Sequence, residues 1–563
     1  MPSSLRVWQV GPIATGAALA LLASAALLFA ALLGGWELLR TALSGPSGGW
    51  SLDPVARALG QRYMLVSPLV NSLLLAVPVA LLATCVGGAL AWLAVRTDLP
   101  GGAAIMPLVA LPHIIPGFQL ASAWVEWFAH GGLWQAAFGH TPLPAYGVAP
   151  MIVVMTLHLM LFPYLLISAN LQASDAALEE AARIAGLSTP RVLWRVTLPL
   201  ARPALAASML LVFAYVMEEF GIPSLLGTPS GFDTLTTRIY GLATTVPLDL
   251  AGASVLALLL GALALLVLLG QIKLLASQRL ETLSGKASRQ SRVALAGWRW
   301  PLAALVGVAL LVAAIAPLAA LGLVSLLDGW GQGYGPANWT LARYGALLHD
   351  EALRRALSNT LSLAAGSALV CTAAAVAIAY GAARLPTGWA ARLARLADRV
   401  SFIAFALPGL VVGLAMILAF SGGWLPLYGT VWLLLLAYAL RFVGVSVRTV
   451  ASRLAQIGPE LESAAAVAGL SRLRVMARIV LPLLSPALFG SAVLVSINAV
   501  KEISATSLLV SQGSETLAYE AYVRFQEGNY TQGSAVSMVM IALVVAMLAI
   551  GRWLARGSAL EGK

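Results

Sequence analysis

The stretch EEAARIAGLSTPRVLWRVTLP (residues 179–199) is a polar segment between two strongly apolar ones. It predicts a short helix, a break at Gly186 and a second short helix that runs into a Leu-Pro pair. A related stretch, ESAAAVAGLSRLRVMARIVLP, returns at residues 462–482 with its glycine at Gly469. In both, the proline of the Leu-Pro pair follows the glycine by 13 positions. We name these stretches the first and second hinge segments. Their recurrence indicates an internal repeat.

The composition places the chain in a membrane. It has 563 residues, of which 60% are hydrophobic and 10% charged, and its mean hydropathy is +0.88. A soluble protein carries about a quarter charged residues. An outer-membrane barrel would show short alternating segments, whereas the apolar runs here are continuous. The predicted fold is therefore an all-α polytopic membrane protein.

Apolar runs long enough to cross a hydrocarbon core of about 30 Å occur twelve times. The predicted spans are 11–34, 67–95, 105–128, 147–170, 199–219, 250–275, 300–327, 357–380, 399–420, 430–450, 482–503 and 531–553.

The distribution of basic residues predicts the orientation. With the N-terminus inside, 24 Lys and Arg residues fall in cytoplasmic segments and nine in outer segments. Both termini and both hinge segments are then cytoplasmic. This bias accounts for the net charge of +11 without a nucleic-acid partner.

Six spans in each half make the two halves parallel repeats. The predicted first repeat is 1–275, the second is 300–563, and the polar segment 276–299 is a cytoplasmic linker. The hinge glycines lie 283 residues apart, and the same offset relates Met217–Phe220 to Val500–Ile503.

The hinge segments are Ala-rich, so each predicts a rigid helix with a nearly bare surface. Such a helix suits a groove on another protein. An ordinary interhelical loop lying on the membrane surface is the alternative, and the identical spacing of two copies favours docking.

The hinge segments also match the pattern E-A-A-x3-G-x9-I-x-L-P, which is similar to the signature of permease subunits of binding-protein-dependent ABC importers. The matching positions are Glu180, Ala181, Ala182, Gly186, Leu198 and Pro199 in the first copy, and Ser463, Ala464, Ala465, Gly469, Leu481 and Pro482 in the second. Ser463 replaces the signature Glu, while Glu462 aligns with Glu179. We therefore expect damage to the first hinge to cost more transport than damage to the second.

The resemblance implies a fused pair of type I importer transmembrane domains in a bacterial inner membrane. It also implies coupling helices at about 175–195 and 458–478, seated on a homodimer of ATPase subunits. A periplasmic or lipid-anchored binding protein would deliver the solute. The sequence has no G-x4-G-K-[ST] stretch, so we expect no enzyme activity and no cofactor in this chain. ATP and Mg²⁺ would bind the partner ATPase.

The segments EFGIPSLLG (219–227) and KEISATSLL (501–509) resemble the ferric-iron group of these permeases. Permeases for thiamine, aminoethylphosphonate and sugar phosphates share much of this layout and remain alternatives. An ion-coupled secondary transporter is the alternative of a different class, but it leaves the paired hinges unexplained.

Ionisable residues within apolar spans predict a translocation path, because such groups usually face a cavity or a partner. The candidates are Glu218, Glu219, Lys501, Glu502, His158 and Arg441. We expect Lys501 to pair with an acidic group of the first half and Arg441 to have a partner. Helix-end groups that reach to the interface are the alternative for the first four, and a hydrogen-bonded core histidine is the alternative for His158. No metal site is predicted.

Overall fold

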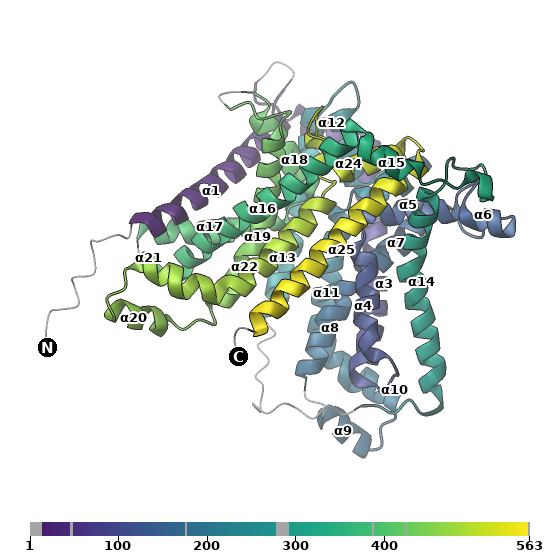
Figure 1. Cartoon of the computed structure of the whole chain (residues 1–563), viewed down its shortest axis with the longest axis horizontal. Helices are drawn as coiled ribbons and strands as arrows, with labels where there is room; N and C mark the ends of the chain where they lie inside the picture. The colour runs from purple at the N-terminus through teal and green to yellow at the C-terminus, as the bar shows by residue number, and fades with distance from the viewer. Residues whose placement is uncertain are drawn as a thin grey trace. The chain divides into compact units, whose positions relative to one another are not determined.

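The computed structural model describes residues 14–45, 49–174, 177–276, 292–385, 388–422 and 425–560 (Figure 1). Within these ranges the secondary structure is helical apart from three isolated β-bridges. Most of the predicted linker 276–299 lies outside the described residues. The chain forms two compact units, which we describe separately.

Unit 2 comprises Leu52–Leu347 and Ala521–Met538. Its helices are α2 (Asp53–Gly60), η2 (Arg62–Val66), α3 (Ser67–Arg96), α4 (Gly102–Ile114), α5 (Gly117–Phe128), α6 (Leu133–Phe138), α7 (Val148–Leu159), α8 (Leu161–Ala173), α9 (Ala177–Ile184), α10 (Thr189–Val192), η3 (Leu193–Thr197), α11 (Leu198–Glu218), η4 (Pro223–Gly227), η5 (Thr228–Ser230), α12 (Leu235–Thr244), α13 (Leu250–Ala276), η6 (Ala296–Trp298), α14 (Arg299–Ser325) and η7 (Pro336–Asn338).

Unit 1 comprises Met1–Ser51, Leu348–Glu520 and Val539–Lys563. Its helices are α1 (Ala14–Ala42), α16 (Glu351–Arg384), α17 (Trp389–Ala406), α18 (Gly409–Phe420), α19 (Val431–Leu454), α20 (Pro459–Val467), α21 (Arg472–Val475), η8 (Met476–Val480), α22 (Leu481–Lys501) and α23 (Thr506–Leu509). Three helices cross a boundary between the units: α15 (Ala342–His349), α24 (Leu517–Gln526) and α25 (Tyr530–Leu560).

The twelve predicted spans correspond to nine continuous helices and three bent pairs of helices among the described residues. The bent pairs are α4 with the α5–α6 segment (91°), α7 with α8 (41°) and α17 with α18 (114°). The sharp bends occur at Pro116 and Pro408, which precede the glycines that begin α5 and α18. The residue before each proline, Ile115 or Leu407, is extended, as clash with the following proline ring favours, so each pair changes direction there.

The repeat is visible in the packing of each unit. In unit 2, α3 packs against α8 and α11. In unit 1, the corresponding helix α16 packs against α19 and α22, and Figure 1 shows these three running side by side. The two halves therefore build the same local core from different residues.

The first helix of each half packs in the unit formed mainly by the other half. α1 lies against α16, α17 and α18, whereas α14 lies against α4 and α5. At the α1 crossing, a Cβ added to Gly34 would meet Met416 Cε at 2.9 Å. At the α14 crossing, the indole Nε1 of Trp127 donates to the carbonyl of Ala316 (2.8 Å). The compact units thus differ from the two sequence repeats by an exchange of first helices.

Candidate functional site

The first hinge segment is a helix closed by a glycine. α9 ends at Ile184, and Gly186 has φ +87°. The amide of Gly186 donates to Arg183 O (2.9 Å), and the amide of Leu187 donates to Ala182 O (3.1 Å). This is the Schellman pattern, which satisfies the last carbonyls of the helix and favours glycine because of the positive φ. The sequence also offers Asp175 as a cap for this helix, but Asp175 lies outside the described residues.

The second hinge segment has the same closure. Gly469 has φ +82°, its amide donates to Ala466 O (3.0 Å), and the amide of Leu470 donates to Ala465 O (3.1 Å). After each glycine comes one α-helical turn, then a π-helical turn, and then the long helix α11 or α22. All three elements recur at the 283-residue offset of the sequence repeat. The Leu-Pro pairs, Leu198-Pro199 and Leu481-Pro482, begin the long helices.

A buried ion pair anchors the first hinge helix. The Nε of Arg96, at the end of α3, lies 3.3 Å from Glu179 Oε1, and the two side chains are 1% and 4% exposed. The Thr197 hydroxyl donates to the same carboxylate oxygen (3.0 Å). Arg96 Nη2 also donates to the Ser174 hydroxyl (2.7 Å). Glu179 therefore joins α9 to both α3 and the turn that begins α11.

The second hinge helix has an equivalent anchor. The Nε of Arg384, at the end of α16, donates to Glu462 Oε1 (2.9 Å), and the Tyr380 hydroxyl donates to Oε2 (2.8 Å). Arg384 Nη2 also reaches the Ile457 carbonyl (2.5 Å). Sequence analysis identified both glutamates but neither arginine. The signal was available, because Arg96 and Arg384 lie just after the second and eighth predicted spans.

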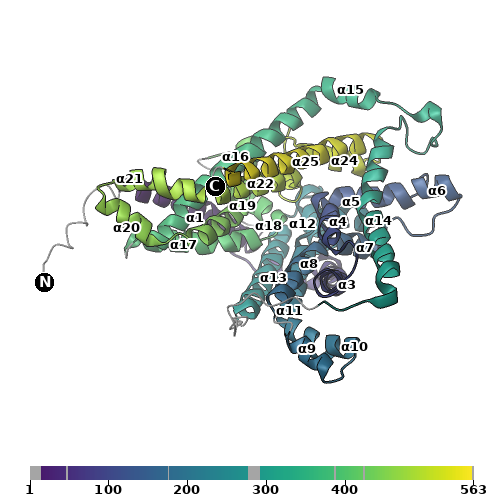
Figure 2. The ribbon, with the colours of Figure 1, turned by 60° about the horizontal axis from the view of Figure 1, so that its bottom comes forward.

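The two hinge helices expose matching surfaces. Ile184 and Val467, which are 283 residues apart, are both 88% exposed. Leu178 and Leu461, at the same offset, are 55% and 52% exposed. Glu180 and Ser463 are exposed as well, together with Ala181 and Ala464, whereas Ala182 is half-buried and Ala465 is buried. Figure 2 shows α9 and α10 projecting beyond the ends of α8 and α11.

The helix breaks after α11 and α22 are capped by equivalent carboxylates. Glu219 Oε1 accepts from the amide of Ile222 (3.2 Å), and Glu502 Oε1 accepts from the amide of Ala505 (2.8 Å). A carboxylate at the start of a helix satisfies amides that lack partners and interacts favourably with the helix dipole. Glu219 and Glu502, both predicted to line the translocation path, therefore also stabilise the backbone at the helix breaks.

Arg441 and Glu502 form a pair within unit 1. Arg441 Nη1 lies 2.8 Å from both carboxylate oxygens, with the side chains 13% and 6% exposed. The Glu502 carbonyl accepts from the Thr506 hydroxyl (2.8 Å), which also meets the Tyr438 hydroxyl (2.6 Å). The predicted partner of Arg441 is therefore Glu502, at the break that follows α22.

His158 occupies the position equivalent to Arg441 but has different neighbours. Its Nδ1 lies 3.0 Å from the Pro112 carbonyl, and the ring is buried. The His113 Nδ1 lies 3.1 Å from the His158 carbonyl, with the ring centroids 4.9 Å apart. His158 therefore packs in a histidine pair, which sequence analysis missed. Glu218 and Lys501 are half-buried at the ends of α11 and α22.

A further buried carboxyl lies in unit 2. Glu126, on α5, is 0% exposed, and the Ser534 hydroxyl donates to its Oε1. Gln119 and Ser122 lie on the same face of α5 and are also buried. A prediction of spans from mean hydropathy does not reveal such groups, because one carboxyl side chain barely changes the mean hydropathy of a span-length stretch.

The apolar helices form two groups, each with a polar hinge, and so define a multi-pass membrane protein with an internal repeat. The family model described as "Binding-protein-dependent transport system inner membrane component" matches residues 83–282 and again 345–558. The chain belongs to this family, and it carries two copies of the domain. It is therefore an inner-membrane permease of the ABC importer class, which separates it from the ion-coupled secondary transporters.

Similar proteins carry names that describe transport. "Ferric transport system permease protein FbpB" of Actinobacillus pleuropneumoniae is 28% identical over 89% of this chain and 73% of its own length. "Putative 2-aminoethylphosphonate transport system permease protein PhnV" of Salmonella choleraesuis is 28% identical over 42% of this chain and 89% of its own length. A solved bacterial ABC transporter for alginate import has a TM-score of 0.38 at 15% identity, covering 46% of this chain and 95% of that one. Over most of its length, the fused pair resembles ferric transport permeases.

Proposed function

We propose that the two hinge helices dock onto separate ATPase subunits, one hinge to each subunit of a homodimer. The observation that carries this proposal is the matched exposure of Ile184 and Val467 on helices that are closed and anchored in the same way. Exposed aliphatic side chains at equivalent positions suit two copies of one apolar groove. The Glu179 and Glu462 anchors would transmit movement of that groove to α3, α11 and α16. ATP and Mg²⁺ would bind in the ATPase.

Aspartate substitution at the exposed tips tests this docking. Ile184→Asp and Val467→Asp place a charge in the proposed contact without disturbing a core, since both side chains are 88% exposed. We expect each variant to lose co-purified ATPase and transport-coupled ATP hydrolysis. Leu341→Asp is the matched control, because Leu341 is 72% exposed and lies outside the hinges. Normal ATPase recovery in both hinge variants would overturn the proposal.

Ferric iron is the solute we propose, delivered by a periplasmic or lipid-anchored binding protein. The support is the likeness to ferric transport permeases across both repeats. Aminoethylphosphonate, thiamine or another small phosphorylated solute is the alternative, and the half-length aminoethylphosphonate permease relative favours the first of these. Uptake of radiolabelled Fe³⁺, aminoethylphosphonate and thiamine by cells expressing the complete importer decides among them. Fe³⁺ uptake that does not depend on this chain would contradict the assignment.

We also propose that the six ionisable residues predicted within apolar spans border the translocation path: Glu218, Glu219, Lys501, Glu502, His158 and Arg441. The support is that the Glu219 and Glu502 carboxylates hold the chain at equivalent breaks in the two halves. Glu219→Ala and Glu502→Ala should each reduce uptake at equal expression. Near-normal uptake in both variants would contradict a role in the path. We further propose that both termini and both hinge segments are cytoplasmic, because the distribution of Lys and Arg residues favours that orientation.

A further inference from the structure

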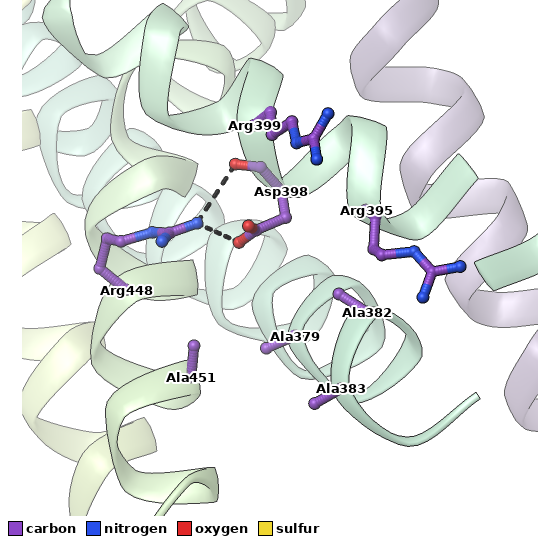
Figure 3. Close-up of a pocket in the computed structure, with 8 residues that line it drawn as sticks. All are labelled: Ala379, Ala382, Ala383, Arg395, Asp398, Arg399, Arg448 and Ala451. Atoms are coloured by element: carbon purple, nitrogen blue, oxygen red, sulfur yellow. Dashed lines mark hydrogen bonds and ion pairs between the residues drawn. The ribbon is translucent and has the colours of Figure 1, made fainter. Parts of the chain in front are cut away.

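A pocket lined by arginines lies in unit 1, where the C-terminal ends of α16 and α19 meet the middle of α17. It has a volume of about 340 Å³. Figure 3 shows Arg395 and Arg399 extending from α17, with Arg448 across from them on α19. The rest of the lining consists of Asp398 and four alanines of α16 and α19, which leave room between the arginines.

Only part of the positive charge in this pocket is neutralised. Arg448 pairs with Asp398, and its guanidinium lies 5.4 Å from the centroid of the Phe402 ring, so it is held in place. Arg395 and Arg399 are exposed, and neither has an acidic partner among the described residues. The pocket lining therefore includes two guanidinium groups that are available to an anion, across from the fixed Arg448, which suits a phosphate group.

The helix that carries these arginines is amphipathic. Its buried face consists of small residues, including Ala391, Ala394 and Ala397. Arg392, Arg395 and Arg399 lie on the exposed side, where Trp389 at the helix start is 72% exposed. After the 114° bend the chain continues as α18, which has no polar side chain. A basic, Trp-bearing helix that adjoins an apolar span is typical of the membrane interface.

We propose that this pocket binds the headgroup of an anionic phospholipid. The phosphate would lie between Arg395 and Arg399, with Arg448 on the opposite wall. The acyl chains would lie along the exposed apolar side chains of α17, which are Leu396, Ile403 and Phe405. Basic pockets between transmembrane helices bind anionic headgroups in this way. The corresponding helix of the first half, α4, has no Lys or Arg, so the site belongs to the second half alone.

Lipid retention tests the site in the full chain. The protein is reconstituted in nanodiscs of phosphatidylcholine with added phosphatidylglycerol, and the lipids retained after extraction are counted by native mass spectrometry. Each arginine beside an anionic headgroup contributes about fivefold in affinity. Arg395→Gln/Arg399→Gln should therefore bind phosphatidylglycerol about 30-fold more weakly. Arg392→Gln is the matched control, because Arg392 is exposed on the same helix but does not line the pocket. It should stay within about twofold, since it lies outside the proposed contact.

Three further outcomes decide the assignment. Equal loss in Arg392→Gln and the double variant would indicate general surface charge and overturn the site. Displacement of the lipid by millimolar inorganic phosphate would indicate a water-soluble phosphate ligand instead, and would overturn the lipid assignment. Arg395→Lys/Arg399→Lys preserves the charge and should retain most of the lipid, which separates lost binding from misfolding. None of these measurements depends on the ATPase or on the transported solute.

Discussion

Arg96 Nε lies 3.3 Å from Glu179 Oε1, with both side chains almost fully removed from solvent. The equivalent pair, Arg384 and Glu462, is closer at 2.9 Å, but its side chains are 18% and 15% exposed. Both hinge helices are therefore anchored by an Arg–Glu ion pair, and the pair of the first hinge is more deeply buried than that of the second. Removal of one partner from a buried pair leaves an uncompensated charge, whereas solvent screens a partly exposed pair.

Loss of the anchor should cost more stability in the first hinge than in the second. Glu179→Ala should lower the free energy of unfolding by about 3–5 kcal/mol, because it leaves the buried Arg96 guanidinium without its acidic partner. Glu462→Ala should cost about 1 kcal/mol, because water reaches Arg384 and screens the pair. Chemical denaturation in detergent measures both. Glu180→Ala is the control, since Glu180 is exposed beside Glu179. Equal losses at Glu179 and Glu462 would contradict the difference in depth.

The hinge glycines should tolerate alanine equally poorly. Gly186 and Gly469 both have a positive φ, and an added Cβ would meet nothing within 4 Å at either position. The cost is therefore that of the backbone conformation alone, about 1 kcal/mol for each Gly→Ala change. Gly35→Ala is the comparison, because Gly35 has equal space and lies within a helix. A much larger loss at one hinge glycine would indicate an additional contact there.

The expected greater importance of the first hinge depends on Glu180, which is replaced by Ser463 in the second. Both side chains are exposed, so their effect must act through a docked partner. Glu180→Ser should weaken ATPase stimulation several-fold without changing the unfolding midpoint. Ser463→Ala should change neither quantity. A loss of stability in Glu180→Ser would show that the residue acts within the chain.

Breaking the Arg441–Glu502 pair should be reversible by a second substitution. Arg441→Met leaves the buried Glu502 carboxylate without its guanidinium and should cost about 3–5 kcal/mol. Arg441→Met/Glu502→Gln should recover most of that loss, because the amide oxygen still accepts from the Ala505 amide. Thermal unfolding monitored by size-exclusion recovery compares the variants. Additive losses in the double variant would show that the pair does not act as a unit.

The packing of α1 can be tested with two adjacent glycines. Gly34→Val would press against Met416 Cε and Ala415 Cβ, 2.9 and 3.2 Å from the added Cβ, whereas Gly35 has nothing within 4 Å. Overpacking typically costs about 1–3 kcal/mol, so Gly34→Val should lower the unfolding midpoint. Gly35→Val should leave it nearly unchanged. Equal behaviour would contradict the crossing of α1 with α18.

The sequence predicted the parts of the fold that repeat. The offset between Gly186 and Gly469 also relates the hinge closures, the exposed tips and the capping carboxylates. The sequence predicted that Arg441 has a partner but did not identify that partner as Glu502, because a sequence contains no distances between helices. The sharp bends at Pro116 and Pro408 were not predicted, since hydropathy gives the length of an apolar run without its direction. The expected pairing of Lys501 with the first half stays a prediction.

The exchange of first helices has a consequence for synthesis. α4 and α5 are made early, yet the helix that covers them, α14, emerges from the ribosome about 170 residues after α5. Conversely, α1 is synthesised before α16, α17 and α18, the helices against which it packs. We expect neither half to reach its final packing until translation has passed the midpoint of the chain. Cutting the gene within the linker should therefore yield two polypeptides that are stable only when produced together.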